Sequence, residues 1–249
     1  MIKDGDTVIL MDKSDDRHKF TPYTGAWQVS QNKNTLFSLQ PQGVNRFDAQ
    51  FMPGRDDNDK RVDDAEVAHA ARIAANAMTM RDTLEDCAFA ISAGLTDKNP
   101  AHKLFIDEAQ QLVMAFDDTN VPRDDADSDF PWKRTDTTVY ALNDKGVNRL
   151  TVMVNPGRDI DGERLSDDET RQIAHQIQLS SALAQAVGVA DALLRNTQPE
   201  TGTFANDDLA MAASDARRLS DCLRRYRPNL APSGDEVGVE AGVIYLEED

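Results

Sequence analysis

An internal repeat constrains this chain more than any other feature of its sequence. Three short blocks recur at one offset of 103 residues, with no gap between them: Thr35–Leu39 and Thr138–Leu142, Gly43–Arg46 and Gly146–Arg149, Pro53–Asp56 and Pro156–Asp159. Over 35–66 against 138–169, 13 of 32 positions are identical, where sequences of ordinary composition match at about one position in sixteen. The sequence therefore predicts a tandem duplication.

The residue pattern predicts the same order of elements in each copy. Runs of β-prone residues predict strands at 25–29, 35–40 and 45–52, and counterparts at 130–134, 138–142 and 147–154. A short oxygen side chain followed three residues later by Glu predicts helix starts near 64 and 167, with ends near Gly94 and Asn196. A second helix then follows in each copy, after Asn99-Pro100 and after Asn206. We expect an α+β fold of two β-β-β-α-α modules in a pseudo-twofold arrangement.

The repeat also sets the expected boundaries. Residues 1–19 form an N-terminal arm or strand, 20–122 the first repeat, 123–232 the second repeat with an acidic linker at its start, and 233–249 a C-terminal strand or tail. No apolar run approaches the ~20 residues of a membrane helix, and the first residues lack the pattern of a secretory signal. Two cysteines suit a reducing compartment. We expect a cytoplasmic protein without membrane contact.

The repeated Asn-Arg and Gly-Arg-Asp blocks are the first candidates for a binding site. A guanidinium recognises phosphate or carboxylate in a planar, bidentate way, so each repeat would bind a small anion. The candidate ligand-binding residues are Asn45, Arg46, Arg55 and Asp56 with Asn148, Arg149, Arg158 and Asp159. A structural interpretation is favoured, because Gly54 and Gly157 suit turns. In this interpretation Arg55 and Arg158 pair with acidic residues at the following helix start.

Other motifs point away from common catalytic and metal chemistry. Asp125, Asp127 and Asp129 resemble the start of a calcium loop, but Phe130 stands where that loop needs Gly. A solvated acidic linker is the better interpretation in a chain this rich in Asp. The histidines lack zinc-ligand spacing, and phosphate-loop, Rossmann and nucleophile-elbow patterns are absent. We expect no cofactor and no metal, and the sequence leans away from an enzyme.

A basic cluster at the end of the last predicted helix has no counterpart in the first repeat. It consists of Arg217, Arg218, Arg224, Arg225 and Arg227. Cations suit a helix C-terminus, and pairing with the protein's own acidic surface is the simplest interpretation. The alternatives are a contact in a homo-oligomer or with a partner and, in third place, a patch that binds phosphate.

Net charge decides the functional expectation. The chain has 44 acidic and 27 basic residues, a net charge of −17. This excess opposes direct nucleic-acid binding, which depends on Lys and Arg that neutralise phosphates. It favours a non-catalytic interaction protein that binds a basic protein surface, as an inhibitor, an antitoxin-like protein or a nucleic-acid mimic. The alternatives are a small-anion binder or enzyme with twin arginine sites, a structural subunit of a larger assembly, and acidity that serves only solubility or a salty environment.

Overall fold

The computed structural model describes residues 27–39, 43–95, 100–159, 161–197 and 206–224. In these ranges the chain forms one seven-stranded antiparallel sheet and five helices, the α+β class that the sequence predicts. The strands are β1 (Trp27–Val29), β2 (Thr35–Leu39), β3 (Asn45–Pro53), β4 (Asp124–Asp125), β5 (Trp132–Thr135), β6 (Thr138–Leu142) and β7 (Asn148–Pro156). The helices are α1 (Asp64–Ala75), α2 (Ala77–Gly94), α3 (Pro100–Asp117), α4 (Asp167–Thr197) and α5 (Asp207–Arg224).

The sheet joins two antiparallel meanders side by side, in the order β1-β2-β3-β7-β6-β5-β4. The meanders meet where β3 pairs with β7. Gln50 lies opposite Met153 at the centre of this pairing, and Phe47 lies opposite Pro156 at one end. Gln50 and Met153 are also 103 residues apart in the sequence. The sheet therefore runs without interruption from the first half of the chain into the second.

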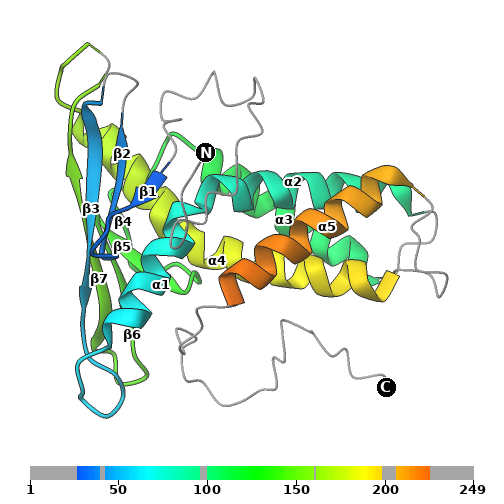
Figure 1. The fold of residues 1–249 in the computed structure, drawn as a ribbon, viewed down its shortest axis with the longest axis horizontal. Coiled ribbons are helices and arrows are strands. Elements are labelled where there is room, and N and C mark those ends of the chain that lie inside the picture. The colour runs from blue at the N-terminus through cyan, green and yellow to red at the C-terminus, as the bar shows by residue number, and fades with distance from the viewer. Residues whose placement is uncertain (1–26, 40–42, 96–99, 160, 198–205, 225–249) are drawn as a thin grey trace.

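Alternation along the strands gives the sheet one apolar face. Phe47, Ala49 and Phe51 of β3 are buried, as are Leu150 and Val152 of β7. Since successive side chains of a strand point to opposite faces, these residues share one side of the sheet. They join a single core with the helices, which all lie on that side in Figure 1. One hydrophobic core thus serves both halves.

Helix starts follow the predicted capping residues. Asp63 Oδ1 accepts a hydrogen bond from Glu66 N at 2.7 Å, and α1 begins at Asp64. Ser166 Oγ accepts from Glu169 N at 3.2 Å, and α4 begins at Asp167. Asn206 Oδ1 likewise accepts from the N–H of Asp208 at the start of α5. Side-chain oxygens here satisfy N–H groups that a helix cannot pair internally, which confirms the predicted starts.

The predicted single helix from 64 to Gly94 is wrong, because the chain breaks at Asn76 into α1 and α2. The first half therefore has three helices instead of two. The side chain of Asn76 donates to Arg72 O at 2.8 Å, and its backbone has φ −97° and ψ 9°. Asn competes in this way for the carbonyls of the preceding turn. Leu179, which stands 103 residues later, is fully buried, and α4 continues through it for 31 residues.

The helices form two regions. Helix α1 and the first part of α4 cover the sheet, while α2, α3, α5 and the rest of α4 form a bundle that projects from it (Figure 1). The predicted acidic linker contributes a short edge strand, β4, which pairs with β5. The predicted end segments at 7–11 and 242–246 lie outside the described residues, as do the N-terminal arm and the C-terminal tail.

Candidate functional site

The repeated Asn-Arg and Gly-Arg blocks meet across the β3–β7 junction. Gly54 N donates to Arg149 O at 2.9 Å, and Gly157 N donates to Arg46 O at 2.8 Å. A Cβ on Gly54 would lie 1.9 Å from Asn148 O, and a Cβ on Gly157 would lie close to the backbone of the opposite block in the same way. No other residue fits a backbone approach this close. The two copies of these blocks therefore have identical residues at the positions where the two halves pack against each other.

The polar side chains of the Gly-Arg-Asp blocks stabilise their own loops. Arg55 Nη1 donates to Asp59 O at 2.7 Å, and Arg158 Nη1 donates to Gly162 O at 2.6 Å. Asp56 Oδ1 accepts the N–H groups of residues 58 and 60, and Asp159 Oδ1 those of residues 161 and 163. Such turns are a common structural use of Asp. Asn45 and Asn148 are exposed at the starts of β3 and β7.

Arg46 and Arg149 turn inward. Arg149 forms a bidentate ion pair with Glu66, with Nε 2.6 Å from Oε1 and Nη2 3.0 Å from Oε2. Burial raises the pKa of Glu66 above its usual value, although Arg149 acts to lower it. Arg46 is only 7% exposed. The two arginines are thus part of the folded interior, and the geometry favours structural roles for the repeated blocks.

A different feature faces solvent: the side of the sheet turned away from the helices, here called the outer face. No described helix lies on it (Figure 1). Leu36 and Ser38 of β2 are buried, so alternation places Phe37 and Leu39 on the outer face. Leu39 is 40% exposed. We call Phe37 and Leu39 the first apolar group.

The second half repeats this arrangement. Val139 and Ala141 of β6 are buried, which places Tyr140 and Leu142 on the outer face. Leu142 is 38% exposed. These two residues, the second apolar group, stand 103 positions after Phe37 and Leu39. The outer face therefore carries an aromatic side chain and an exposed leucine at matching places in both halves.

A mostly polar row separates the two apolar groups. Thr35 lies opposite Gln50, Gln50 opposite Met153, and Met153 opposite Thr138. Gln50 and Met153 are exposed. Met153 is the one apolar side chain of these four, and Met52, opposite Thr151, adds a second methionine to the outer face next to this row.

Each apolar group borders a loop rich in carboxylates. Leu142 pairs with Asn148, and Arg55 N, at the start of loop 54–64, donates to Asn148 O at 2.9 Å. Leu39 pairs with Asn45, which accepts from the loop 157–168 in the same way. Loop 54–64, the first acidic loop, runs into the first residue of α1 and has five acidic and three basic residues. Loop 157–168, the second acidic loop, runs into the first two residues of α4 and has five acidic and two basic residues. Both loops carry a net negative charge, and Lys133 lies opposite Tyr140 at the second group.

The predicted basic cluster lies on the helical bundle. Arg217 Nε is 4.0 Å from Asp191 Oδ1, and Arg218 Nη2 is 3.4 Å from Asp215 Oδ1. Asp191 is 1% exposed and also pairs with Arg195. The side chain of Arg224 and residues 225 and 227 lie outside the described part. The described arginines pair with the protein's own carboxylates.

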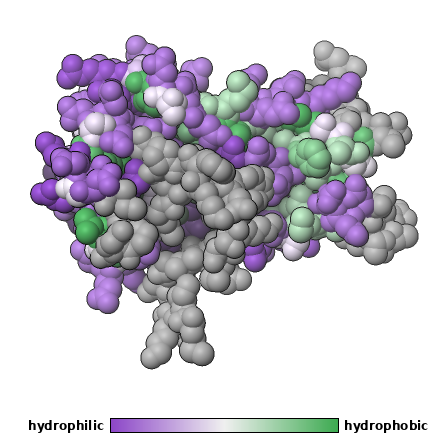
Figure 2. All heavy atoms as spheres, turned by 90° about the horizontal axis from the view of Figure 1, so that it is seen from above, coloured by the Kyte–Doolittle hydropathy of each residue, from purple (hydrophilic) through white to green (hydrophobic). Residues whose placement is uncertain are grey.

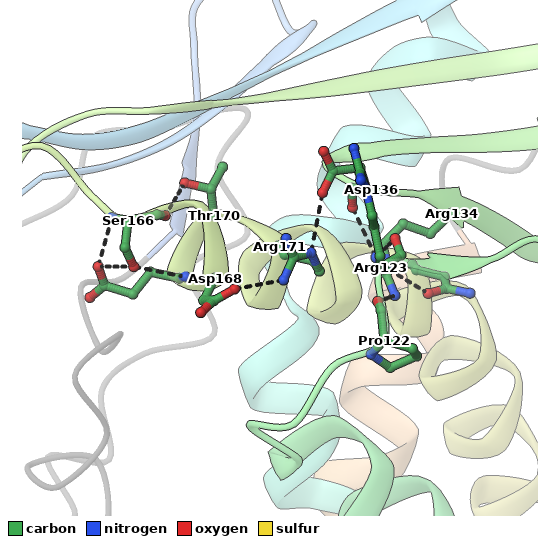
Figure 3. A network of polar contacts seen from close by, with 10 residues as sticks. Pro122, Arg123, Arg134, Asp136, Ser166, Asp168, Thr170 and Arg171 are labelled. Atoms are coloured by element: carbon green, nitrogen blue, oxygen red, sulfur yellow. Dashed lines mark hydrogen bonds and ion pairs between the residues drawn. The ribbon is translucent and has the colours of Figure 1, made fainter.

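The acidic linker is fastened to α4 by a buried network that contains Arg134 (Figure 3). Arg134 is fully buried and donates to Pro122 O, Arg123 O and Asp136 O at 2.7, 3.0 and 2.9 Å. Its Nε also donates to Gln178 Oε1 at 3.3 Å. Burial lowers the pKa of this guanidinium. The network orders the linker around a buried cation.

The calcium-like motif contributes to this same network. Asp125 Oδ2 accepts from Gln178 Nε2 at 2.7 Å, and Ser128 Oγ is 3.2 Å from the same nitrogen. Within the described ranges, no group of three or more His, Cys, Asp or Glu side chains is placed to hold a metal ion. Of the cysteines, Cys87 is buried, and burial raises its pKa to about 12, so its thiol is a poor nucleophile.

Two residues of the sheet escaped sequence reasoning. Trp27 lies opposite Ser38 and Trp132 lies opposite Ala141, so the tryptophans occupy matching places in the two meanders. They are 105 residues apart because the first hairpin is two residues longer. A search at constant offset misses such a pair, whereas the rarity of Trp in this sequence was a usable signal. No comparable signal marks Arg134, because Val29 occupies the matching place in the first meander.

Further exposed apolar side chains lie on the bundle: Phe89, Leu104, Met114 and Met211. Figure 2 shows hydrophobic atoms over the helical end, while hydrophilic atoms dominate the visible part of the sheet end. By length and composition, Asp167–Asn196 of α4 could cross a membrane, but 56% of its most apolar window is buried in the fold. A core helix has the same properties, so this is weak evidence for a membrane span.

Comparison with known proteins adds no relative. No protein-family model matches the sequence, no curated protein matches it at a significant level, and no solved structure matches the fold at a significant level. The function is therefore argued from the outer face and its charges.

Proposed function

We propose that this chain is a non-catalytic binding protein whose outer face takes a basic, amphipathic protein segment. The carrying observation is the pair of exposed leucines, Leu39 and Leu142, which stand beside an aromatic side chain and next to an acidic loop. The apolar side of the segment would pack on these side chains, and its Lys and Arg residues would face the acidic loops. An inhibitor, antitoxin-like or nucleic-acid-mimic role would follow from covering a basic surface of the partner.

Two physical effects would supply the affinity. Burial of apolar surface contributes about 25 cal/mol per Å², so covering two half-exposed leucines and their aromatic neighbours contributes a few kcal/mol. The net charge of −17 attracts a basic partner at long range and speeds its association. This second effect is weakened by salt, which makes it measurable.

The proposal includes a tandem duplication of a strand-and-helix module with pseudo-twofold placement of the copies. Support comes from the β3–β7 pairing, which is centred on two residues 103 positions apart, Gln50 and Met153. Further support comes from α2, since adding 103 to its bounds gives 180–197, the last part of α4. On this view both apolar groups descend from one ancestral surface.

Calorimetric titration with two synthetic helical peptides tests the proposed function. One peptide contains only leucine and lysine, with leucine on one side of the helix, and the other has glutamate in place of each lysine. We expect the lysine peptide to bind, with an affinity that falls as salt is raised, and the glutamate peptide to show no binding. Equal affinity for both peptides, or affinity that salt leaves unchanged, would contradict the proposal.

A matched pair of double variants locates the binding. Leu39→Lys with Leu142→Lys alters the outer face, while Leu104→Lys with Met114→Lys makes the same charge change on α3, where these residues are 43% and 72% exposed. We expect only the first pair to abolish binding. Equal loss in both would show that net charge alone attracts the peptide. Light scattering of the protein alone gives a further test. A dimer that forms in the wild type and is abolished by Leu39→Lys with Leu142→Lys would contradict the proposal.

A further inference from the structure

We infer that the outer face holds two basic segments at once, one on each half, so that one chain binds two copies of the partner segment. This inference rests on the proposed function and deepens it by giving the number and position of the bound segments. Such a partner is either a symmetric dimer that presents the same segment twice or two separate copies.

The separation of the apolar groups carries the inference. The first group is Phe37 with Leu39, and the second is Tyr140 with Leu142. Between them runs the row from Thr35 to Thr138, in which three of four side chains are polar. One amphipathic segment laid across the centre would bury polar groups there and would lose hydrogen bonds to water. Two segments, each over one apolar group, avoid this cost.

The charges divide in the same way. The start of the second acidic loop bonds to Asn45, the neighbour of Leu39, through Arg158 N at 3.0 Å. The start of the first acidic loop bonds to Asn148, the neighbour of Leu142, at 2.9 Å. Each apolar group therefore has its own carboxylates, contributed by the loop of the other half. Neither apolar group depends on the loop beside the other group to attract a cation.

The sheet is wide enough for two segments. Neighbouring strands lie about 4.8 Å apart, and a helix with its side chains is about 10 Å across. Seven strands therefore leave room for two helices side by side. An extended segment needs still less width.

A comparison inside the sequence adds an independent argument. At the centre of the outer face Gln50 and Met153 differ, while Thr35 and Thr138, at the two ends of the same row, are identical. At the hairpin ends, Leu39 matches Leu142 and Val44 matches Val147, and all four are between 38% and 45% exposed. Single exposed apolar residues are ordinary. Identical apolar residues at two pairs of exposed positions, beside Gln50 and Met153, which differ, indicate that both ends are used.

The number of bound peptides tests the inference. Native mass spectrometry and calorimetry with the leucine–lysine peptide should give two bound copies per chain. Leu39→Lys alone and Leu142→Lys alone should each leave one copy, and the double variant none. Leu104→Lys, which adds the same charge on α3, should keep two. One copy at saturation, or complete loss in either single variant, would overturn the inference while leaving the proposed function intact; no binding at all would overturn both.

A tandem peptide supplies a second readout. Two copies joined by a flexible linker should bind at least a hundredfold more tightly than one copy, because the second site is then filled at high effective concentration. Each single variant should remove that gain. If a lysine variant does not fold, as judged by circular dichroism, Leu39→Ser and Leu142→Ser replace it and should weaken one site about tenfold. A tandem peptide no tighter than the single one would overturn the inference.

Discussion

The two halves of the molecule use one helix-start pattern in two ways. At the start of α4, Glu169 Oε2 accepts a hydrogen bond from Ser166 N at 2.9 Å, which completes a capping box. At the start of α1, Glu66 instead forms an ion pair with Arg149 of the other half. Both helices begin where the pattern predicts. A local pattern therefore fixes where a helix begins, while the packing of the halves decides what its glutamate binds.

Interior substitutions separate the halves further. Asn76 ends α1, whereas Leu179, which stands 103 residues later in the sequence, is buried within the continuous α4. Arg134 fastens the linker in the second half, where the first half has Val29. As a result, the second half has a longer helix, α4, which contacts the buried polar network around Arg134. The backbone hydrogen bonds at the junction between the halves, by contrast, are the same on both sides.

The largest expected effect tests whether the two backbone crossings at the β3–β7 junction, at Gly54 and Gly157, are equivalent. Gly54→Ala and Gly157→Ala should each lower the free energy of unfolding by about 3 kcal/mol or more, because the new Cβ overlaps backbone atoms of the opposite block. Chemical denaturation measures both. A large loss in only one variant would show that the two crossings are not equivalent.

Gly188→Ala provides the matched control. Nothing lies within 4 Å of a Cβ at this position of α4, so the same change should stabilise the protein by about 0.5 to 1 kcal/mol. Destabilisation at all three glycines would indicate that close approach is not the cause.

The next effect compares one position in the two halves. Leu179→Ala removes a fully buried side chain and should cost about 3 kcal/mol. Asn76→Ala loses one hydrogen bond, to Arg72 O, and should cost about 1 kcal/mol. Denaturant titration of the two variants gives the difference. Equal losses of unfolding free energy would mean that the Asn76 side chain contributes as much to stability as the buried Leu179 side chain.

A smaller effect tests the buried cation of the second half. Arg134→Met leaves the carbonyls of Pro122, Arg123 and Asp136 without this donor and should cost about 2 kcal/mol. Hydrogen exchange should rise in residues 122–136 and stay unchanged in β1 and β2. Unchanged exchange in the linker would show that other contacts hold it.

The smallest effect is a pH dependence at His175. Burial lowers its pKa below the usual 6.5, while Ala115 O, at 2.9 Å from Nε2, acts in the opposite direction. The unfolded chain therefore binds the proton more readily, and stability should fall as the pH drops below about 6.5, by at most about 1.4 kcal/mol per pH unit. Glu66 acts with the opposite sign, so the test is the difference between the wild type and His175→Gln. Parallel pH profiles would exclude His175 as the cause.

Much of the fold could be predicted from the sequence because its signals are local. Alternation placed six strands to within a few residues, and capping side chains placed the helix starts. The break at Asn76 was not predicted, because Asn is tolerated inside helices and only its bond to Arg72 O shows the interruption. Arg55 and Arg158 were predicted to pair with acidic residues at the next helix start, but both donate to carbonyl groups of their own loops, at Asp59 and Gly162. The outer face could not be predicted from the sequence, because only the arrangement of the helices on the sheet shows which side they leave uncovered.

Chemical-shift mapping of leucine methyl groups tests the central claim most directly. The protein is titrated with the leucine–lysine peptide, and the methyl signals of Leu39, Leu142 and Leu104 are followed. The outer-face account predicts shifts at Leu39 and Leu142 that saturate together, with Leu104 unchanged. Shifts confined to Leu104 and other bundle residues would contradict it and place the binding surface on the helices.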